Sequence, residues 1–228
     1  MKILVIDIGG THVKVLATGR TQRLMIESGP EMTPGKMMAA VKAGTAGWKY
    51  EAVSIGYPGP VVHGRPMLEP VHLASGWCRY DFKKAFGRPV KMINDAAMQA
   101  LGSYAGGRML FLGLGTGLGS ALIVENVLEP MELAHLPYRK GRTYEDYVGL
   151  AGLERMGKKK WRHHVNKIVA QLKVALQPDY VVLGGGNARL IHELPPNTRL
   201  GDNADAFKGG FRLWEKAFSG SVHKRFMH

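Results

Sequence analysis

Short apolar runs that end in glycine-containing turns dominate the hydrophobic pattern of the first half of the chain. The opening run "KILVIDI" is followed by "HVKVLAT" and "RLMIES", and all three runs are rich in apolar or β-branched residues, as is typical of strands. This half predicts, in order, strands over 2–8, 12–18 and 23–28, a helix over 34–48, a strand over 51–62 that ends in a Pro-Gly turn, and a strand that continues into a helix near Asp95 over 88–106.

The second half repeats this arrangement from Met109 onward. It predicts strands over 109–114 and 120–125 around a glycine turn, helices over 142–156 and 161–176, a strand, a triple-glycine turn and a helix over 179–191, and a last helix over 204–218. Strands that alternate with helices favour an α/β protein. Two blocks that each begin with a hairpin predict an internally duplicated molecule, with an N-terminal lobe over 1–106 and a C-terminal lobe over 107–228.

Three glycine turns follow predicted strands, in "VIDIGGTH", "FLGLGTGLG" and "LGGGN". Glycine lets the backbone approach a ligand closely, and successive N–H groups can converge on an anion. The alternative for each turn is a tight hairpin that needs glycine only for its shape. The P-loop pattern G-x-x-x-x-G-K-[ST] is absent. A dinucleotide fold would require a helix after its glycine turn, whereas "GLGTGLG" leads into a strand-like segment. Nearby groups suit a phosphate site: the hydroxyls of Thr11 and Thr116, the cation of Lys14, and Asp7, which can hold magnesium through water.

The composition restricts where the protein is expected to function and which kinds of partner it is expected to bind. The chain has 228 residues, of which 45% are hydrophobic and 21% charged, and no apolar run is long enough for a membrane span. The single cysteine, Cys78, excludes an internal disulfide and a cysteine-based zinc site, so we expect a reducing cytoplasm. A net charge of +13 favours anionic partners. The cluster "KKKWRHH" over 158–164 is either a solvated helix face or an anion-binding surface, and its single aromatic residue, Trp161, does not favour nucleic acid.

The order of several motifs resembles a known family. "DIGGTHVK", "INDA", "LGTGLGSALI", "ELAH" and "VVLGGGN" follow one another as in the ROK family of sugar kinases, and "SGWCRYDF" and "ELAHLPYRKGRTYEDYVG" resemble the polyphosphate glucokinase branch. The resemblance covers nearly the whole chain. It implies the two-lobed α/β fold of the actin-like ATPases and hexokinases, which is ribonuclease H-like, with a sugar in the cleft and phosphate held by the two hairpin loops.

The resemblance also assigns residues to roles. Asp95 matches the catalytic base and Asp7 the metal site, although an aspartate at a strand-to-helix junction can also be a helix N-cap. For Glu145, the alternative to sugar binding is a helix-capping interaction of Thr143 with Asp146 or Glu145. The sugar ligands are expected to be Asn94, Glu132, His135 and Glu145. The phosphate ligands are expected to be Gly9, Gly10, Thr11, Lys14, Gly115, Thr116, Gly117 and Gly185.

Two positions depart from the family pattern beside the expected sugar site. His72 or Leu73 stands near the place of a common asparagine, and Ala134 replaces the usual glycine of the "ELGH" motif. The segment 136–142 has no cysteine, so a structural zinc is not expected. We expect an enzyme, and a homodimer, that uses magnesium to move phosphate from polyphosphate, and also from ATP, to the 6-hydroxyl of glucose.

Three alternatives remain. They are an ATP-dependent ROK hexokinase for another sugar, a non-catalytic sugar-binding protein, and a ROK regulator, which would need a DNA-binding domain ahead of Asp7. The tail over 219–228 has no assigned role.

Overall fold

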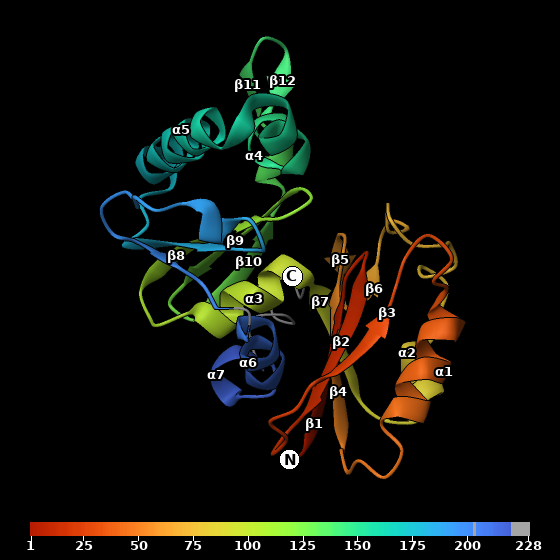
Figure 1. The fold of residues 1–228 in the computed structure, drawn as a ribbon. Coiled ribbons are helices and arrows are strands. Elements are labelled where there is room, and N and C mark those ends of the chain that lie inside the picture. Colours follow the sequence, from red (N-terminus) through yellow and green to blue (C-terminus); the bar gives the residue numbers. More distant parts are fainter. Residues whose placement is uncertain (203, 220–228) are drawn as a thin grey trace, which may run out of the picture.

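Two five-stranded sheets with the same topology form the framework of the protein (Figure 1). The computed structural model describes residues 1–202 and 204–219, so the tail from residue 220 onward lies outside the described residues. The first sheet has the order β3-β2-β1-β4-β7, with β1 (Ile3–Ile8), β2 (His12–Ala17), β3 (Leu24–Glu27), β4 (Ala52–Tyr57) and β7 (Val90–Asn94). The second has the order β10-β9-β8-β13-β14, with β8 (Arg108–Leu114), β9 (Leu118–Val124), β10 (Val127–Met131), β13 (Tyr180–Gly184) and β14 (Thr198–Leu200).

Each sheet begins with an antiparallel meander and ends with two parallel strands. In the first sheet β1 pairs antiparallel with β2 and parallel with β4, and in the second β8 pairs antiparallel with β9 and parallel with β13. The duplicated, hairpin-led arrangement expected from the sequence is therefore confirmed. The two glycine turns, β1–β2 and β8–β9, hold equivalent places in the two sheets.

Seven helices occur in the described part of the chain: α1 (Pro34–Gly44), α2 (Phe82–Phe86), α3 (Asp95–Ser103), α4 (Tyr144–Val148), α5 (Leu150–Leu176), α6 (Asp205–Arg212) and α7 (Lys216–Ser219). Thr33 caps the N-terminus of α1, and Pro34 occupies the first turn. A backbone N–H in the first turn has no partner within the helix, so its absence in proline costs nothing there. Its apolar residues Met37, Met38 and Val41 are buried against the first sheet. None of the described helices has the length and apolar character needed to cross a membrane.

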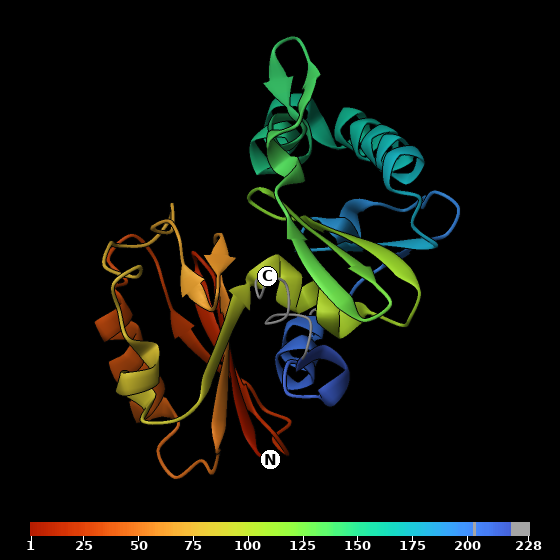
Figure 2. The ribbon, with the colours of Figure 1, turned by 180° about the vertical axis from the view of Figure 1, so that it is seen from behind.

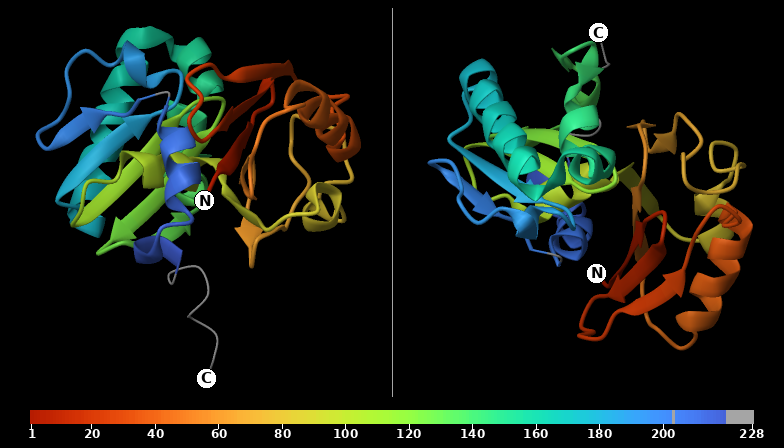
Figure 3. Two further views of the ribbon diagram at one scale, coloured as in Figure 1. Left: turned by 90° about the horizontal axis from the view of Figure 1, so that it is seen from below. Right: turned by 45° about the horizontal axis from the view of Figure 1, so that its top comes forward.

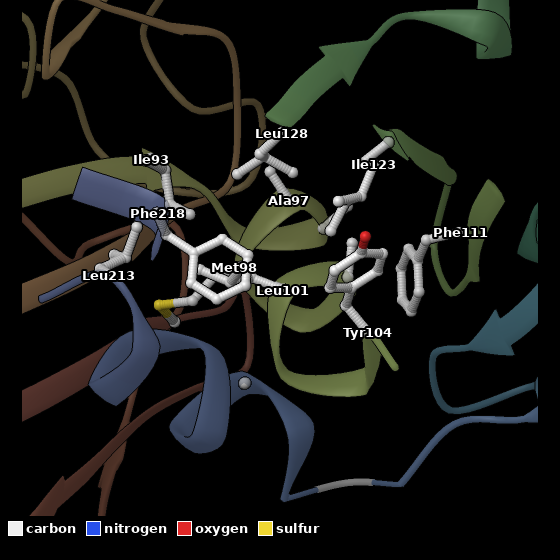
Figure 4. Close-up of a cluster of buried hydrophobic side chains, with 14 of the residues drawn as sticks. Ile93, Ala97, Met98, Leu101, Tyr104, Phe111, Ile123, Leu128, Leu213 and Phe218 are labelled. Carbon is white, nitrogen blue, oxygen red and sulfur yellow. The ribbon is translucent and has the colours of Figure 1, made fainter. Parts of the chain in front are cut away.

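Helices α3 and α6 cross each other between the two sheets (Figures 2 and 3). A central apolar cluster surrounds them, with residues of α3 such as Met98 and Leu101 packed beside Phe111 and Ile123 of the second sheet and Leu213 beyond α6 (Figure 4). One further cluster lies beneath α1 in the first sheet and another beneath α5 in the second. Since α6 also contacts β1 and β4, the end of the described chain returns to the first sheet, and the boundary near residue 106 stays a prediction.

Four expectations about elements need correction. The segment after the triple glycine forms one 3-10 turn, Ala188–Leu190, and not a helix. The strand expected over 51–62 stops at Tyr57, and a separate hairpin of β5 (Val61–Val62) and β6 (Arg65–Pro66) follows. The helix expected over 142–156 is divided at Gly149 into α4 and the start of α5, because Gly149 is extended with ψ 177°. The helix expected over 204–218 is divided into α6 and α7 by residues 213–215. Gly157, with φ 73° and ψ 162°, interrupts the helical backbone of α5 in the expected gap between the helices over 142–156 and 161–176.

Several elements carried no clear sequence signal. They are β10, β14, the short helix α2, and the hairpin of β11 (Pro137–Arg139) and β12 (Arg142–Thr143). β10 follows a tight turn in which Glu125 and Asn126 both have positive φ, the conformation of a type I′ hairpin turn. The sequence did not predict β10, because the apolar run ends at the polar residue Glu125 and no glycine indicates a hairpin turn there.

Candidate active site

The turn between β1 and β2 contains the first predicted phosphate loop. Gly9 donates its N–H to the carbonyl oxygen of His12 at 3.0 Å, and a Cβ atom on Gly9 would lie 2.9 Å from that oxygen. Asp7 is in register with Lys14 on β2, and Lys14 Nζ lies 3.4 Å from Asp7 Oδ2. The turn therefore needs glycine for its shape, and the hairpin presents a carboxylate and an ammonium group together.

The turn between β8 and β9 is the second predicted phosphate loop. Gly115 donates to the carbonyl oxygen of Gly117 at 3.1 Å, which closes the turn. Glu145 accepts the N–H of Leu118 at its Oε2 atom at 2.9 Å, and a Cβ atom on Gly117 would lie 2.2 Å from the same oxygen. Glu145 thus buttresses the loop in this structure, and its role as a sugar ligand stays a prediction.

The capping alternative for this segment is resolved by Asp146. Thr143 Oγ1 accepts the N–H of Asp146 at 3.3 Å, and Asp146 Oδ2 accepts the N–H of Thr143 at 2.7 Å, so the two residues form a complete capping box. The hydrogen bonds that the N–H and the hydroxyl of Thr143 donate to Asp146 Oδ2 lower the pKa of the Asp146 carboxyl. Because Asp146 performs the capping, the carboxylate of Glu145 is left to point at the glycine loop.

The triple-glycine turn supports the second loop from behind. Gly185 has φ 81°, and a Cβ atom there would lie 2.5 Å from the carbonyl oxygen of Leu114. Asn187 donates its backbone N–H to that same oxygen at 2.9 Å and its Nδ2 to the carbonyl oxygen of Gly115 at 3.1 Å. Asn187 therefore supports the backbone of the second loop, a contact that the pattern "LGGGN" does not by itself indicate.

Asn94 and Asp95 stand where β7 passes into α3. Asn94 Oδ1 accepts the N–H of Ala97 at 3.1 Å and caps the helix, while Asn94 Nδ2 donates to the carbonyl oxygen of Gly59 at 3.2 Å. The N-cap is therefore Asn94 and not Asp95, which corrects the alternative considered for Asp95. Asp95 occupies the first turn of α3, and its Oδ1 accepts the N–H of Ala96 at 2.7 Å.

The surroundings of Asp95 disfavour its charged form. Burial raises the pKa of the Asp95 carboxyl to about 7, and the charges of Asp7 and Glu132 add to this effect, although the Ala96 N–H opposes it. Asp7 on the first sheet and Glu132 beyond the second are thus both electrostatic neighbours of Asp95. A Cβ atom on Gly119 of β9 would lie 2.5 Å from Ala96 Cβ, so the second hairpin packs directly on the start of α3.

Glu132 and His135 lie in a short segment that leaves the second sheet. Glu132 precedes the 3-10 turn Leu133–His135, and both side chains are exposed. Ser120 on β9 fixes the segment, because its Oγ donates to the carbonyl oxygen of Met131 at 2.7 Å and accepts the N–H of Leu133 at 3.2 Å. The predicted sugar ligands Asn94 and Glu132 therefore come from different sheets, and Glu132 is close enough to influence the charge of Asp95, which follows Asn94.

The segment that departs from the family pattern packs on the first glycine loop. A Cβ atom on Gly10 would lie 3.0 Å from His72 Cβ, so His72, an exposed histidine, adjoins the loop. Glu69 holds the following residues, since its carboxylate accepts the N–H groups of Gly76, Trp77 and Cys78 at 3.0, 2.9 and 3.2 Å. The sequence did not predict that Glu69 accepts three backbone N–H groups, because Glu69 belongs to no recognisable motif.

Some side chains of the basic cluster over 158–164 lie on the surface, and others are buried in the core. Lys158, Lys159 and Lys160 are exposed, but Trp161 is fully buried and donates its indole N–H to the carbonyl oxygen of Val148 at 2.9 Å. His164 is buried as well, and its Nδ1 lies 3.0 Å from the hydroxyl oxygen of Tyr138. The rings of Trp161 and His164 therefore serve packing, whereas the three lysines are exposed and can contact an anion.

The carboxylates near the glycine loops suit a magnesium ion. Magnesium is usually bound by one or two carboxylates, by water and by substrate phosphates, and it does not need a cage of protein ligands. Burial raises the pKa of Asp7 while Lys14 lowers it, which marks Asp7 as a partly desolvated carboxylate that a cation would stabilise. In residues 1–202 and 204–219 no group of three or more His, Cys, Asp or Glu side chains forms a metal site.

Comparison with known proteins identifies relatives by sequence and by structure. No family model matches the chain. The chain is 28% identical over 208 residues to the polyphosphate glucokinase of Mycobacterium tuberculosis, an alignment that covers 81% of this chain and 77% of that protein. Its structure is similar to the inorganic polyphosphate/ATP-glucomannokinase of Arthrobacter sp. strain KM, with a TM-score of 0.77, 25% identity, and coverage of 92% of this chain and 96% of that chain.

A third relative shares the fold alone. The ROK family glucokinase of Streptomyces griseus, solved with glucose and AMPPNP, has a TM-score of 0.75 at 17% identity, with 93% of this chain and 99% of that chain covered. The protein has the fold of the ROK family sugar kinases, which is the actin-like ATPase/hexokinase fold. Within that class, its sequence resembles the polyphosphate glucokinases.

Proposed function

We propose that this protein is a sugar kinase that transfers the terminal phosphate of polyphosphate, and also of ATP, to the 6-hydroxyl of glucose, with Asp95 as the general base. The observation that carries the proposal is the setting of Asp95. Asp95 begins α3, the next residue, Ala96, packs on Gly119 of the second glycine hairpin, and burial together with the charges of Asp7 and Glu132 raises the pKa of the Asp95 carboxyl to about 7. A base with a pKa close to the operating pH is well suited to accept the proton of an alcohol.

The proposed mechanism assigns a task to each part of the site. Phosphoryl transfer requires an oriented alcohol, a neutralised donor and a proton acceptor. Asn94, Glu132, His135 and Glu145 orient the sugar, the N–H and hydroxyl groups of the two glycine loops hold the donor phosphates, and Lys14 adds a cation. A magnesium ion held by Asp7 would neutralise charge on the donor. Asp95 takes the proton of the sugar hydroxyl while the hydroxyl oxygen bonds to the terminal phosphorus of the donor. The bond between that phosphorus and the bridging oxygen breaks, and the shortened polyphosphate, or ADP, leaves.

Polyphosphate as donor has two supports. The chain carries a net charge of +13, and the relatives that are similar in sequence are named for polyphosphate. A linear polyanion needs repeated cations and no purine pocket, so it suits such a surface. The proposal also includes a homodimer in the cytoplasm, and sedimentation equilibrium of the purified chain tests the homodimer.

A magnesium-dependent assay of glucose 6-phosphate formation tests the function. Glucose is supplied with ATP as sole donor in one reaction and with polyphosphate in the other, and we expect product in both, with the higher kcat/KM for polyphosphate. Product from ATP alone would remove polyphosphate from the proposal. Absence of product with both donors would direct attention to His72 and Ala134, which adjoin the expected sugar site, and other hexoses would then be assayed.

The rate is expected to depend on the ionisation of Asp95. A carboxyl group with a pKa of about 7 is protonated at lower pH and cannot accept a proton, so kcat/KM should fall about tenfold for each pH unit below 7 and reach a plateau above it. The measurement is kcat/KM for glucose from about pH 5.5 to 8.5, with glucose binding measured over the same range as the control. A rate that does not change across this range would contradict the assignment of Asp95.

A further inference from the structure

A second concave site lies on the open edge of the first sheet, at strand β7. A cavity of about 890 Å³ is bounded by the β5–β6 hairpin, the segment 78–83, strand β7 and Leu213. Figure 2 shows β7 leading to α3, with the β5–β6 hairpin beside the end of the strand, and α2 comes shortly before β7 in the chain. Neither the glycine loops nor the predicted sugar ligands line it. The cavity is therefore separate from the candidate active site, although β7 leads to Asp95.

The lining of this cavity is strongly basic. It contains Arg65, Arg79, Lys83 and Lys91 but only one carboxylate, Asp81. Asp81 is engaged in capping α2, since its Oδ1 accepts the N–H of Lys84 at 2.9 Å. A single engaged carboxylate cannot neutralise four cations, and the low-dielectric walls of a concave site strengthen the resulting field.

Three of the four cations have no competing partner. Lys91 is committed to structure, because its Nζ donates to the carbonyl oxygen of Leu213 at 2.7 Å and lies 4.7 Å from the Trp214 ring centre. Arg65, Arg79 and Lys83 are exposed, and within the ranges 1–202 and 204–219 none of them forms an ion pair. Their charges are thus available to a ligand.

A shallower depression extends the basic surface. It has a volume of about 580 Å³, shares Asp81 and Lys83 with the first cavity, and adds Lys84 and Arg88. The two adjoining hollows are lined by six cations, of which Lys91 is held by Leu213 and Arg88 lies 5.2 Å from the Tyr50 ring centre. The remaining cations are distributed over both hollows, so a row of anionic groups can contact more of them than a lone phosphate can.

We propose that the β7 cavity and its extension bind a chain of linked phosphates. Several phosphates in a row match the distributed cations better than one carboxylate or one phosphate does. The aromatic rings of the lining do not offer free faces for nucleic-acid bases, because Tyr80 packs edge-on against Phe82 with 4.8 Å between ring centres and Phe82 is buried. The chain of phosphates has two natural sources, inorganic polyphosphate and a nucleoside triphosphate.

The test is the stoichiometry of tripolyphosphate binding to the full chain, measured by isothermal titration calorimetry. The double variant Arg79→Glu/Lys83→Glu reverses two exposed charges of the cavity, and Lys42→Glu/Lys49→Glu reverses two exposed charges that do not line it. We expect the first variant to bind one tripolyphosphate fewer per chain than the wild type, and the second to bind the same number. This difference does not depend on whether the glycine loops bind phosphate or whether the protein is a kinase.

Further measurements distinguish the two sources of linked phosphates and exclude unfolding of the variants as the cause of lost binding. Affinity that increases with phosphate chain length would identify inorganic polyphosphate, and equal affinity for ATP and tripolyphosphate would identify the triphosphate group of either source. The neutral variant Arg79→Gln/Lys83→Gln should have the thermal transition of the wild type. Its affinity for tripolyphosphate at the β7 cavity should be lower by about tenfold or more. Unchanged stoichiometry and affinity in both cavity variants, or binding of ATP without tripolyphosphate, would overturn the proposal.

Discussion

Asp95→Asn is expected to reduce phosphoryl transfer by about 10²- to 10⁴-fold, the usual contribution of a positioned general base. Asparagine is close to aspartate in shape but cannot take a proton from the sugar hydroxyl. The helix should persist, because Asn94 caps α3 and Asp95 only occupies its first turn. Glucose binding should therefore change little, and the loss should appear in kcat. Single-turnover transfer and equilibrium glucose binding, measured on the same preparation, separate the two quantities.

The same substitution should stabilise the fold at alkaline pH. The folded-state pKa of Asp95 is raised to about 7, so folding disfavours the charged form, and the wild type loses stability as pH rises from about 4 to 7. Asp95→Asn removes this cost and should increase the free energy of unfolding at pH 8 by about 1–3 kcal/mol. Asp202→Asn, an exposed carboxylate outside the site, is the matched control and should change neither property. Near wild-type transfer by the Asp95 variant would refute its role as base.

The sequence predicted the features that depend on short segments. The strands around "VIDIGGTH" and "FLGLGTGLG" could be predicted because apolar runs interrupted by glycine have few other structures. The position of Asp95 at a strand-to-helix junction could be predicted for the same reason, since β7 and α3 both have clear local patterns. These segments also carry the motifs of the family resemblance.

The contacts between distant segments could not be predicted in this way. Glu145 reaches the N–H of Leu118 across 27 positions of the sequence, and Gly185 packs on Leu114 because two loops meet in space. Nothing in the local pattern distinguishes a glutamate that supports a loop from one that binds sugar. The difference between the two aspartates of "YED" and "IND" is likewise tertiary: Asp146 is stabilised in its charged form by the Thr143 hydrogen bonds, whereas burial and nearby carboxylates disfavour charge on Asp95.

The glycines of the helix crossing are the strongest example of such a non-local requirement. Glycine usually weakens a helix, yet α3 contains Gly102 and α6 contains Gly209 and Gly210. A Cβ atom on Gly102 would lie 1.8 Å from the carbonyl oxygen of Asp205, and one on Gly209 would lie 1.7 Å from that of Met98. The two helix backbones are therefore in direct contact, and this contact joins the first sheet to the second.

Gly209→Ala is accordingly expected to destabilise the fold by about 3 kcal/mol or more, at the upper end of the cost of overpacking. The obstacle is backbone on the facing helix, so side-chain rotation cannot relieve it and α6 must move away from α3. Gly35→Ala is the matched control, because that glycine also lies in a helix but its Cβ would meet only Thr33 Oγ1 at 3.9 Å. The control should be neutral or stabilising by up to about 1 kcal/mol.

Chemical denaturation of both variants measures the difference, and the kinase assay shows whether it reaches the site. Asp95 begins α3, and Gly210 of α6 lies against Val5 of β1, two residues before Asp7. A shift of α6 should therefore alter the spacing of Asp7 and Asp95, and the folded fraction of Gly209→Ala should have a lower kcat than the wild type. Equal stabilities of the two variants would mean that the helices can separate at no cost, and the crossing would then not fix the geometry between the sheets.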